Sequence, residues 1–381
     1  MNWLIFVFAS ITETLLRMLP FPCKTGLMKI GNPGRNSPVF LTCNFRLTVQ
    51  RVKKALKGID AYLLVANSRG INVWCAATGG HFTNHDVISV LKTSGIEDLV
   101  DHRNVVLPQL AAAGIEATDM HKKTGWKVIW GPVYAKDIPA FLRNDFNKTA
   151  GMRQVVFPWL QRLEFAVSWA FPISLLSVII TALFWREAIL PLIFFIWGLS
   201  FLIFMAFPLY SRWLSPGGRR TGIIFFDFGR GGFQLILLGA TILGLATYSL
   251  LSGNFAWGFV LRWSFASFVV ILMLSLDLMG STPVYKSGLL EDRLLKVVLD
   301  EEKCRGAGFC EQVCPRNCYE VDNNRHKATM PGAERCVQCG ACIIQCPFDA
   351  LCFRSPHGWV IPPEDIRKFK LNMMGKRIVK V

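Results

Sequence analysis

Nine of the twelve cysteines in this chain lie between Cys304 and Cys352, and most of them have the spacing of iron–sulfur ligands. The downstream run is C-x2-C-x2-C-x3-C-P, formed by Cys336, Cys339, Cys342, Cys346 and Pro347. Three thiolates on one short loop can reach three irons of the same cluster. A zinc ribbon would have two separated C-x2-C pairs, and a disulfide framework would be unusual in the cytoplasm. The run therefore predicts a [4Fe–4S] cluster.

The upstream run repeats this spacing with one change, because Ala307 stands where the second cysteine belongs. In two-cluster ferredoxins the last cysteine of each run binds the other cluster. One complete set is then Cys314, Cys336, Cys339 and Cys342. The second site keeps only Cys304, Cys310 and Cys346, which suit a [3Fe–4S] cluster or a [4Fe–4S] cluster with a non-cysteine or displaced fourth ligand. Cys318 is the nearest spare thiolate, and like Cys352 it could equally be a small buried side chain.

Cys75 lies in another distinctive stretch, between Gly70 and Gly80. Periodicity does not decide here between a strand and a helix. A lone cysteine among apolar residues is usually part of a core, and Gly79-Gly80 could form a turn. The residues alone therefore leave the function of Cys75 open. Cys23 and Cys43 have no assigned role.

The segment around Cys75 belongs to a predicted α/β domain at 31–155. An amphipathic helix is expected over 83–94, where Thr83 and Asp86 form a weak capping box and Gly95 ends the helix. Strands that alternate with short helices predict a compact mixed or parallel sheet. The strand candidates are Val39–Thr42, Tyr62–Val65 and Lys127–Trp130.

The composition predicts that part of the chain lies in a membrane. Of 381 residues, 52% are hydrophobic and 18% charged, which argues against disorder, collagen and a simple soluble enzyme. A hydrocarbon core about 30 Å thick needs about 20 helical residues. Four apolar stretches meet this length and predict an α-helical transmembrane bundle at 160–282, near 165–184, 188–209, 232–252 and 257–279.

Basic residues predict the orientation of these spans. They gather before the first span, after the second and after the fourth, as Arg143, Lys148, Arg153, Arg162, Arg212, Arg219, Arg220, Arg230, Lys286, Arg293 and Lys296. Positive loops stay in the cytoplasm, so both flanking domains are expected on the cytoplasmic side of the inner membrane. The remaining parts are an interfacial segment at 1–30, a ferredoxin-like α+β domain with two clusters at 295–360 and a basic tail at 361–381. No nucleic-acid-binding module accompanies the net charge of +16.

A family resemblance gives the Cys75 segment more weight. Residues 72–77, Asn-Val-Trp-Cys-Ala-Ala, resemble the cap-helix motif N-(V/I)-W-C-A-(A/G)-G-K of the mercury-methylating corrinoid proteins. The tail resembles the separate ferredoxin that partners these proteins, so the two are fused here. The chain departs from the family at Thr78-Gly79, which replaces Gly-Lys, and in having no cysteine pair after Cys352. The resemblance extends to 31–33, 36–39, 107–110, 131–133 and the membrane segment.

The resemblance implies that the α/β domain binds a cobalamin-type corrinoid. Cys75 would supply a thiolate, a soft ligand, to cobalt, while Trp74 would pack near the ring and Asn72 would fix the segment. The other motif residues, Val73, Ala76 and Ala77, complete the cofactor-binding stretch, and the iron–sulfur domain would reduce cobalt.

The function expected from this resemblance is membrane-bound corrinoid-dependent methyl transfer, with Hg(II) as a candidate acceptor. A methyl donor protein or a methyl-folate system and an external electron donor would be the partners, beside membrane lipid. The alternatives are a membrane-anchored ferredoxin-type electron carrier without cobalt, and a corrinoid methyl carrier of one-carbon metabolism that does not act on mercury.

Overall fold

The computed structural model describes residues 11–12, 14–15, 20–211, 233–253, 255–278, 295–355 and 357–372. Half of the predicted interfacial segment, the basic residues at 212–230 and 286–293, and the end of the basic tail lie outside the described residues. The chain divides into two compact units, Pro20–Val156 with Leu290–Val381, and Met1–Leu19 with Phe157–Leu289. The predicted α/β and ferredoxin-like domains therefore belong to one unit, and the apolar helices form the other.

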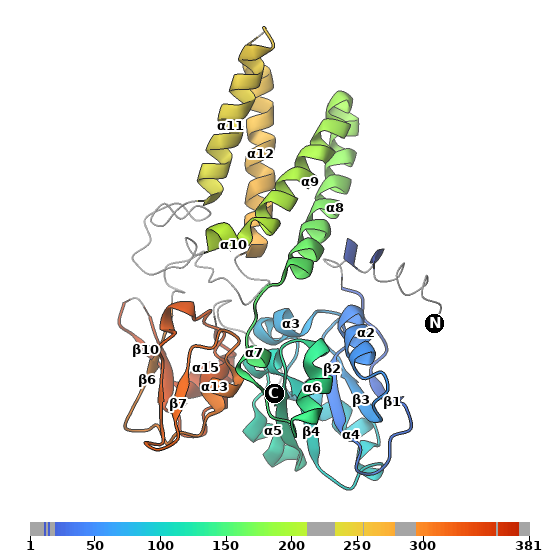
Figure 1. Cartoon of the computed structure of the whole chain (residues 1–381), viewed down its shortest axis with the longest axis vertical. Coiled ribbons are helices and arrows are strands. Elements are labelled where there is room, and N and C mark those ends of the chain that lie inside the picture. Colours follow the sequence, from blue (N-terminus) through green and yellow to red (C-terminus); the bar gives the residue numbers. More distant parts are fainter. Residues whose placement is uncertain are drawn as a thin grey trace. The chain divides into compact units, whose positions relative to one another are not determined.

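A five-stranded sheet forms the α/β domain (Figure 1). The three predicted strands are confirmed, and their apolar runs fit strands covered on both faces. The order is β1-β3-β2-β4-β5, in which β1 is antiparallel to β3 and the other pairs are parallel. Because β1 pairs with β3, the sheet begins before the predicted boundary at residue 31. The strands are β1 (Gly26–Ile30), β2 (Val39–Cys43), β3 (Ala61–Ala66), β4 (Asn104–Pro108) and β5 (Lys127–Gly131).

Helices cover both faces of this sheet. The core on one face includes side chains of α3 (Val73–Gly79), α4 (Asn84–Thr93) and α5 (Ala117–Thr124). The core on the other face includes side chains of α2 (Arg46–Ala55) and α6 (Ile138–Arg143). The capping box of Thr83 and Asp86 is present at the start of α4, as predicted.

β2 lies between β3 and β4 in the sheet. The chain runs from β2 to β3 on one side and then crosses to β4 on the other side, so the strand order reverses beside β2. In open α/β sheets, ligands bind at the carboxyl ends of strands at such a switch point. A ligand-binding site is therefore expected at the segments that follow β2, β3 and β4.

The ferredoxin-like domain contains two small sheets, ordered β10-β9-β6 and β7-β8, and a pair of short helices in contact with each other, α13 (Phe309–Val313) and α14 (Ala341–Gln345). A further helix, α15 (Pro363–Phe369), packs on α14 and β9, so the ordered domain continues past residue 360 into the predicted basic tail. The strands are β6 (Lys296–Leu299), β7 (Glu320–Asp322), β8 (Lys327–Thr329), β9 (Leu351–Arg354) and β10 (Val360–Ile361).

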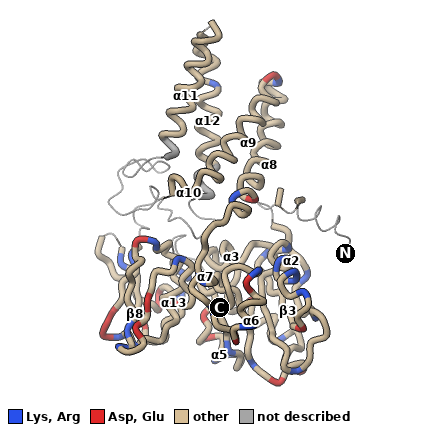
Figure 2. The backbone as a smooth tube through the Cα atoms, in the orientation of Figure 1, with Lys and Arg blue, Asp and Glu red and all other residues tan. Residues whose placement is uncertain are grey.

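The second unit consists of apolar helices that coincide with the four predicted spans, and Figure 2 shows few charged residues along them. They are α8 (Trp159–Phe184), α9 (Ile189–Met205), the short α10 (Phe207–Tyr210), α11 (Phe233–Leu251) and α12 (Trp257–Leu278). By length and composition, two helical segments of the described chain could cross a membrane, Trp159–Phe184 and Arg186–Met205. The apolar parts of the other two helices, Ile236–Leu251 and Trp257–Met273, are shorter.

Candidate functional site

The Cys75 segment is helical, which the sequence pattern alone left undecided. Asn72 is the N-cap of α3, and its side-chain oxygen accepts a hydrogen bond from the Cys75 backbone N–H at 3.0 Å. Asparagine is among the best N-cap residues because its side chain satisfies an otherwise unpaired amide. Gly80 ends the helix in the left-handed conformation at φ 75°. Asn72 therefore caps the helix that carries Cys75.

Only part of the motif reaches the surface. Cys75 and Asn72 are partly exposed, whereas Val73, Ala76 and Ala77 are buried in the core of the α/β domain. Trp74 is 4% exposed and belongs to the same core, so it supports α3 from the protein side. Its position near a corrinoid ring stays a prediction. The exposed face of α3 thus presents one soft ligand, the thiol of Cys75. A thiolate is a soft donor, so this cysteine fits the role of a ligand to a cobalt ion that approaches α3 from outside.

Asn44, directly after β2, orders the loop that leads into α3. Its side-chain oxygen accepts hydrogen bonds from the Ser68 backbone N–H at 2.9 Å, the Ser68 hydroxyl at 3.0 Å and the Gly70 backbone N–H at 3.0 Å. Gly70 has φ +70°, and a Cβ there would lie 2.6 Å from the Pro22 nitrogen. Sequence reasoning missed Asn44. The available signal was a polar residue at the carboxyl end of a buried parallel strand.

The other cysteines of the α/β domain lie outside α3, on or before strands of the sheet. Cys43 is fully buried at the end of β2, and this burial raises the pKa of its thiol to about 11. It therefore stays protonated and packs as a small apolar side chain. Cys23 is partly buried ahead of β1, and its backbone N–H donates to the Asn44 carbonyl.

Two cavities in the ferredoxin-like domain divide the cluster cysteines. The first, with an empty volume of about 340 Å³, is lined by Cys304, Cys310 and Cys346 together with Ala307, and we call it the three-cysteine cavity. The second, of about 300 Å³, we call the five-cysteine cavity. Its cysteines are Cys314, Cys318, Cys336, Cys339 and Cys342. These are the two ligand sets expected from the spacing, with Cys318 added to the complete one.

The five-cysteine cavity fits a [4Fe–4S] cluster. Among the described residues, no three His, Cys, Asp or Glu side chains are grouped closely enough to hold a single metal ion. The thiolates of a [4Fe–4S] cluster bind different irons and need not converge on a single ion. Cys318 lies here rather than at the three-cysteine cavity, and its backbone N–H donates to the sulfur of Cys314 at 3.3 Å.

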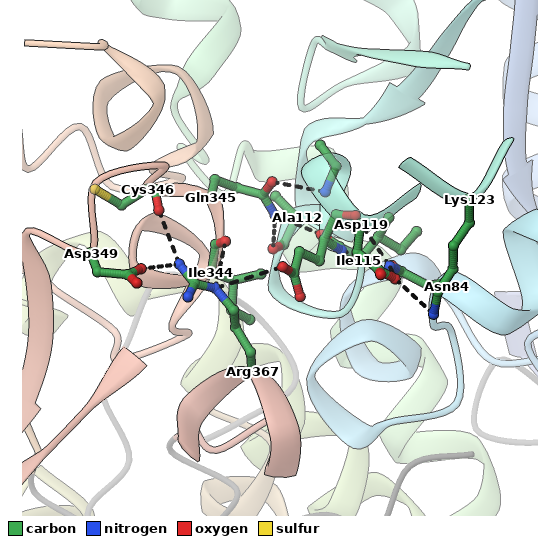
Figure 3. A network of polar contacts seen from close by, with 12 residues as sticks. Asn84, Ala112, Ile115, Asp119, Lys123, Ile344, Gln345, Cys346, Asp349 and Arg367 are labelled. Carbon is green, nitrogen blue, oxygen red and sulfur yellow. Dashed lines mark hydrogen bonds and ion pairs between the residues drawn. The ribbon is translucent and has the colours of Figure 1, made fainter. Parts of the chain in front are cut away.

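The ferredoxin-like domain is joined to the α/β domain by buried polar contacts (Figure 3). Gln345, at the end of α14, donates from its amide nitrogen to the carbonyls of Ala112 and Ile115. Its amide oxygen accepts from the Ala117 backbone N–H at 3.2 Å. Nearby, Arg367 of α15 lies 3.8 Å from the Glu116 carboxylate. One glutamine thus satisfies three backbone groups of the other domain.

A second set of contacts lies beside α13. Lys148 donates to the Gln109 side-chain oxygen at 2.6 Å and to the Gln312 carbonyl at 2.7 Å. Arg153 pairs with Glu311 at 2.8 Å. Desolvation of the ammonium group, with repulsion from Arg153, lowers the pKa of Lys148 to about 7, although the residue as a whole keeps some exposed surface. These contacts place a titratable lysine and an ion pair in the junction between the domains.

The short 3-10 helix η2 (Gln109–Ala113) links the two candidate sites. It contacts α3, which carries Cys75, and it also contacts α13 and α14 of the ferredoxin-like domain. Residues of the five-cysteine region join the core of the α/β domain here, among them Val337 and Cys339. The complete cluster set therefore lies against the domain that carries Cys75.

Comparisons with known proteins agree with this division. Residues 17–142 match the family model of the CO dehydrogenase/acetyl-CoA synthase delta subunit, and residues 303–350 match the 4Fe-4S dicluster domain. The chain carries a corrinoid-binding-type domain and a ferredoxin-type 4Fe–4S domain.

The similar proteins are gamma subunits of the acetyl-CoA decarbonylase/synthase complex. The subunit from Methanopyrus kandleri is 39% identical over 128 residues, which is 33% of this chain and 27% of that protein. The subunit from Archaeoglobus fulgidus is 38% identical over 129 residues, with the same two shares. The chain thus spans about a quarter of the length of these relatives.

Proposed function

We propose that this protein is a corrinoid-dependent methyl carrier with its own iron–sulfur electron donor. The observation that carries the proposal is the junction at η2, which contacts the Cys75 helix and both short helices of the ferredoxin-like domain. Fusion and docking keep an electron donor beside the cofactor domain without a diffusional encounter.

Each residue has a role in this proposal that follows from its position. Cys75 supplies the thiolate toward cobalt, Asn72 holds the start of α3, and Asn44 orders the preceding loop. The corrinoid would supply the methyl-transfer chemistry when bound, and the Cys75 thiolate would tune it as a cobalt ligand. Cys314, Cys336, Cys339 and Cys342 would hold the cluster that supplies electrons, beside the η2 junction.

The similarity to acetyl-CoA decarbonylase/synthase gamma subunits favours a place in one-carbon metabolism. A methyl donor protein or a methyl-folate system would load the carrier, and other protein subunits are plausible partners. Transfer to Hg(II) is the second candidate, favoured by the 72–77 motif on a capped helix with a partly exposed cysteine.

We further propose that the apolar helices anchor the protein in the cytoplasmic membrane, with both other domains on the cytoplasmic side. Several large apolar side chains of α8 and α9 are exposed in the structure, including Leu183 at 74%, Phe184 at 84% and Phe194 at 75%. Such a surface is costly in water and favourable in lipid.

The function is tested by metal and spectral analysis of the full chain purified without oxygen. Cobalt should be present together with iron, and the corrinoid absorbance should shift in Cys75→Ala, because cobalt loses its thiolate. Cys23→Ala is the matched control, since it removes a partly buried thiol that packs against the core on the other face of the sheet, and it should leave the spectrum unchanged.

Three results separate the candidate functions. Iron without cobalt would contradict the corrinoid proposal and favour the ferredoxin-type electron carrier. Cobalt with an unchanged Cys75→Ala spectrum would overturn the ligand role alone. Incubation of the methyl-loaded protein with Hg(II) then decides the acceptor, because a one-carbon carrier should form no methylmercury.

A further inference from the structure

The two cysteine runs share a backbone conformation, which makes Ala307 the structural counterpart of Cys339. Left-handed residues recur at matching positions, Gly306 (φ 67°) with Gln338 (φ 55°) and Gly308 (φ 75°) with Gly340 (φ 77°). Each of α13 and α14 begins after the second of these residues and has a cysteine as its C-cap. The loop at Ala307 therefore has the same backbone geometry as the loop that presents the Cys339 thiol, but Ala307 has no thiol.

Among the described residues that line the cavity, no other side chain can take this place. Besides the three cysteines, the three-cysteine cavity is lined by Gly, Ala, Leu, Phe and Pro residues and by Arg305. A guanidinium has no acceptor atom and does not bind iron. Neither spare thiol of the domain helps, because Cys318 lines the other cavity and Cys352 lies on β9 and lines neither. The residues present therefore do not fit a cluster that needs four protein ligands.

We propose that the three-cysteine cavity holds a [3Fe–4S] cluster bound by Cys304, Cys310 and Cys346, while the five-cysteine cavity holds the [4Fe–4S] cluster. Three thiolates match three irons, and the missing corner lies at Ala307, which is exposed to solvent. This proposal rests on the ferredoxin-type domain and not on the corrinoid, so a protein without cobalt would leave it intact.

The experiment counts iron and sulfide in the full chain, reconstituted with ferrous iron and sulfide under anaerobic conditions, before any oxidant is added. The wild type should hold about seven irons and about eight sulfides per chain. After mild oxidation it should show the electron paramagnetic resonance signal of an oxidised three-iron cluster, since an oxidised [4Fe–4S]²⁺ cluster is diamagnetic.

Restoring the missing ligand gives the sharpest comparison. Ala307→Cys should raise the content to about eight irons and abolish the three-iron signal, because the repeated backbone places the new thiol as Cys339 is placed. The matched control is Ala333→Cys, which adds a thiol at an exposed position of the same domain that lines neither cavity. It should behave as the wild type does.

Cys318→Ser tests the competing ligand and should keep both the iron count and the three-iron signal. About eight irons in the anaerobic wild type would overturn the proposal, since a cluster with a solvent-derived fourth ligand would then occupy the site. Loss of the signal in Cys318→Ser would overturn it as well, because Cys318 would then be a ligand of the three-iron cluster.

Discussion

Two amide side chains position the thiol of Cys75, one on each side of the loop that precedes α3. Asn44 gathers three donors of that loop on one buried oxygen, and Asn72 caps the helix itself. Neither residue carries charge, so the position of α3 should depend little on pH or salt. The contribution of each amide comes from satisfying backbone groups that would otherwise be buried without a partner.

The cap can be removed on its own. Asn72→Ala should cost about 1 kcal/mol of local stability, because the Cys75 amide loses its acceptor. Hydrogen exchange at the Cys75 amide should then accelerate about fivefold, measured by mass spectrometry of peptides that cover α3.

Asn72→Asp serves as the control for this substitution, since a carboxylate also accepts at an N-cap and suits the helix dipole. Its exchange should match that of the wild type. Equal rates in Asn72→Ala and the wild type would show that the cap does not hold α3.

At the scale of elements, η2 determines which helices meet. Its end approaches α3 so closely that a Cβ at Gly114 would lie 2.9 Å from the Ala77 Cα. Any larger residue there would push α3 away from η2. The same short element receives α13 and α14, so displacement on one side should be felt on the other.

Gln345 is the side chain whose loss should loosen this junction. Gln345→Ala leaves the Ala112 and Ile115 carbonyls and the Ala117 amide without their partner, at about 1–3 kcal/mol for an unsatisfied buried group. Hydrogen exchange across residues 109–117 should accelerate by about tenfold or more.

Gln312→Ala is the matched control on the same domain. Gln312 is exposed, and its backbone carbonyl rather than its side chain accepts from Lys148, so the effect should stay within about 0.5 kcal/mol. Unchanged exchange in Gln345→Ala would mean that apolar contacts alone hold the two domains together.

At the scale of the whole molecule, composition separates the two units. The helical unit carries its large apolar side chains outward as well as inward, while most charges of the described chain lie on the other unit (Figure 2). A helix that is hydrophobic on all sides is stable within a large core or in lipid. Leu251, 83% exposed on α11, illustrates the excess of apolar surface.

We therefore expect the protein to remain in the membrane pellet after washes with high salt and alkaline carbonate, and to need detergent for extraction. Leu183→Arg with Phe194→Arg places two charges on exposed apolar surface and should reduce the pelleted fraction. Release of the wild type by carbonate would contradict a membrane anchor.

Much of the local structure could be predicted because it depends on neighbours in sequence. The capping box at Thr83, the strands around Val39, Tyr62 and Lys127, and the two cysteine sets all follow from spacing. Cluster ligands are read well from sequence because short loops bring nearby thiolates to one place. The capped helix at Asn72 was harder, since seven residues are too few for periodicity to distinguish a helix from a strand.

The sequence by itself determined the chemistry available to this protein, namely the cysteine sets, the absent ligand at Ala307, the cysteine motif at 72–77 and the apolar stretches. Only the tertiary structure decided where these groups lie in relation to one another. It placed Cys318 at the complete cluster set, Trp74 in the core, and α13 and α14 on the element that touches α3. The physical reason is that these arrangements join residues distant in sequence, such as Gln345 with Ala112, through burial and hydrogen bonds that no local pattern encodes.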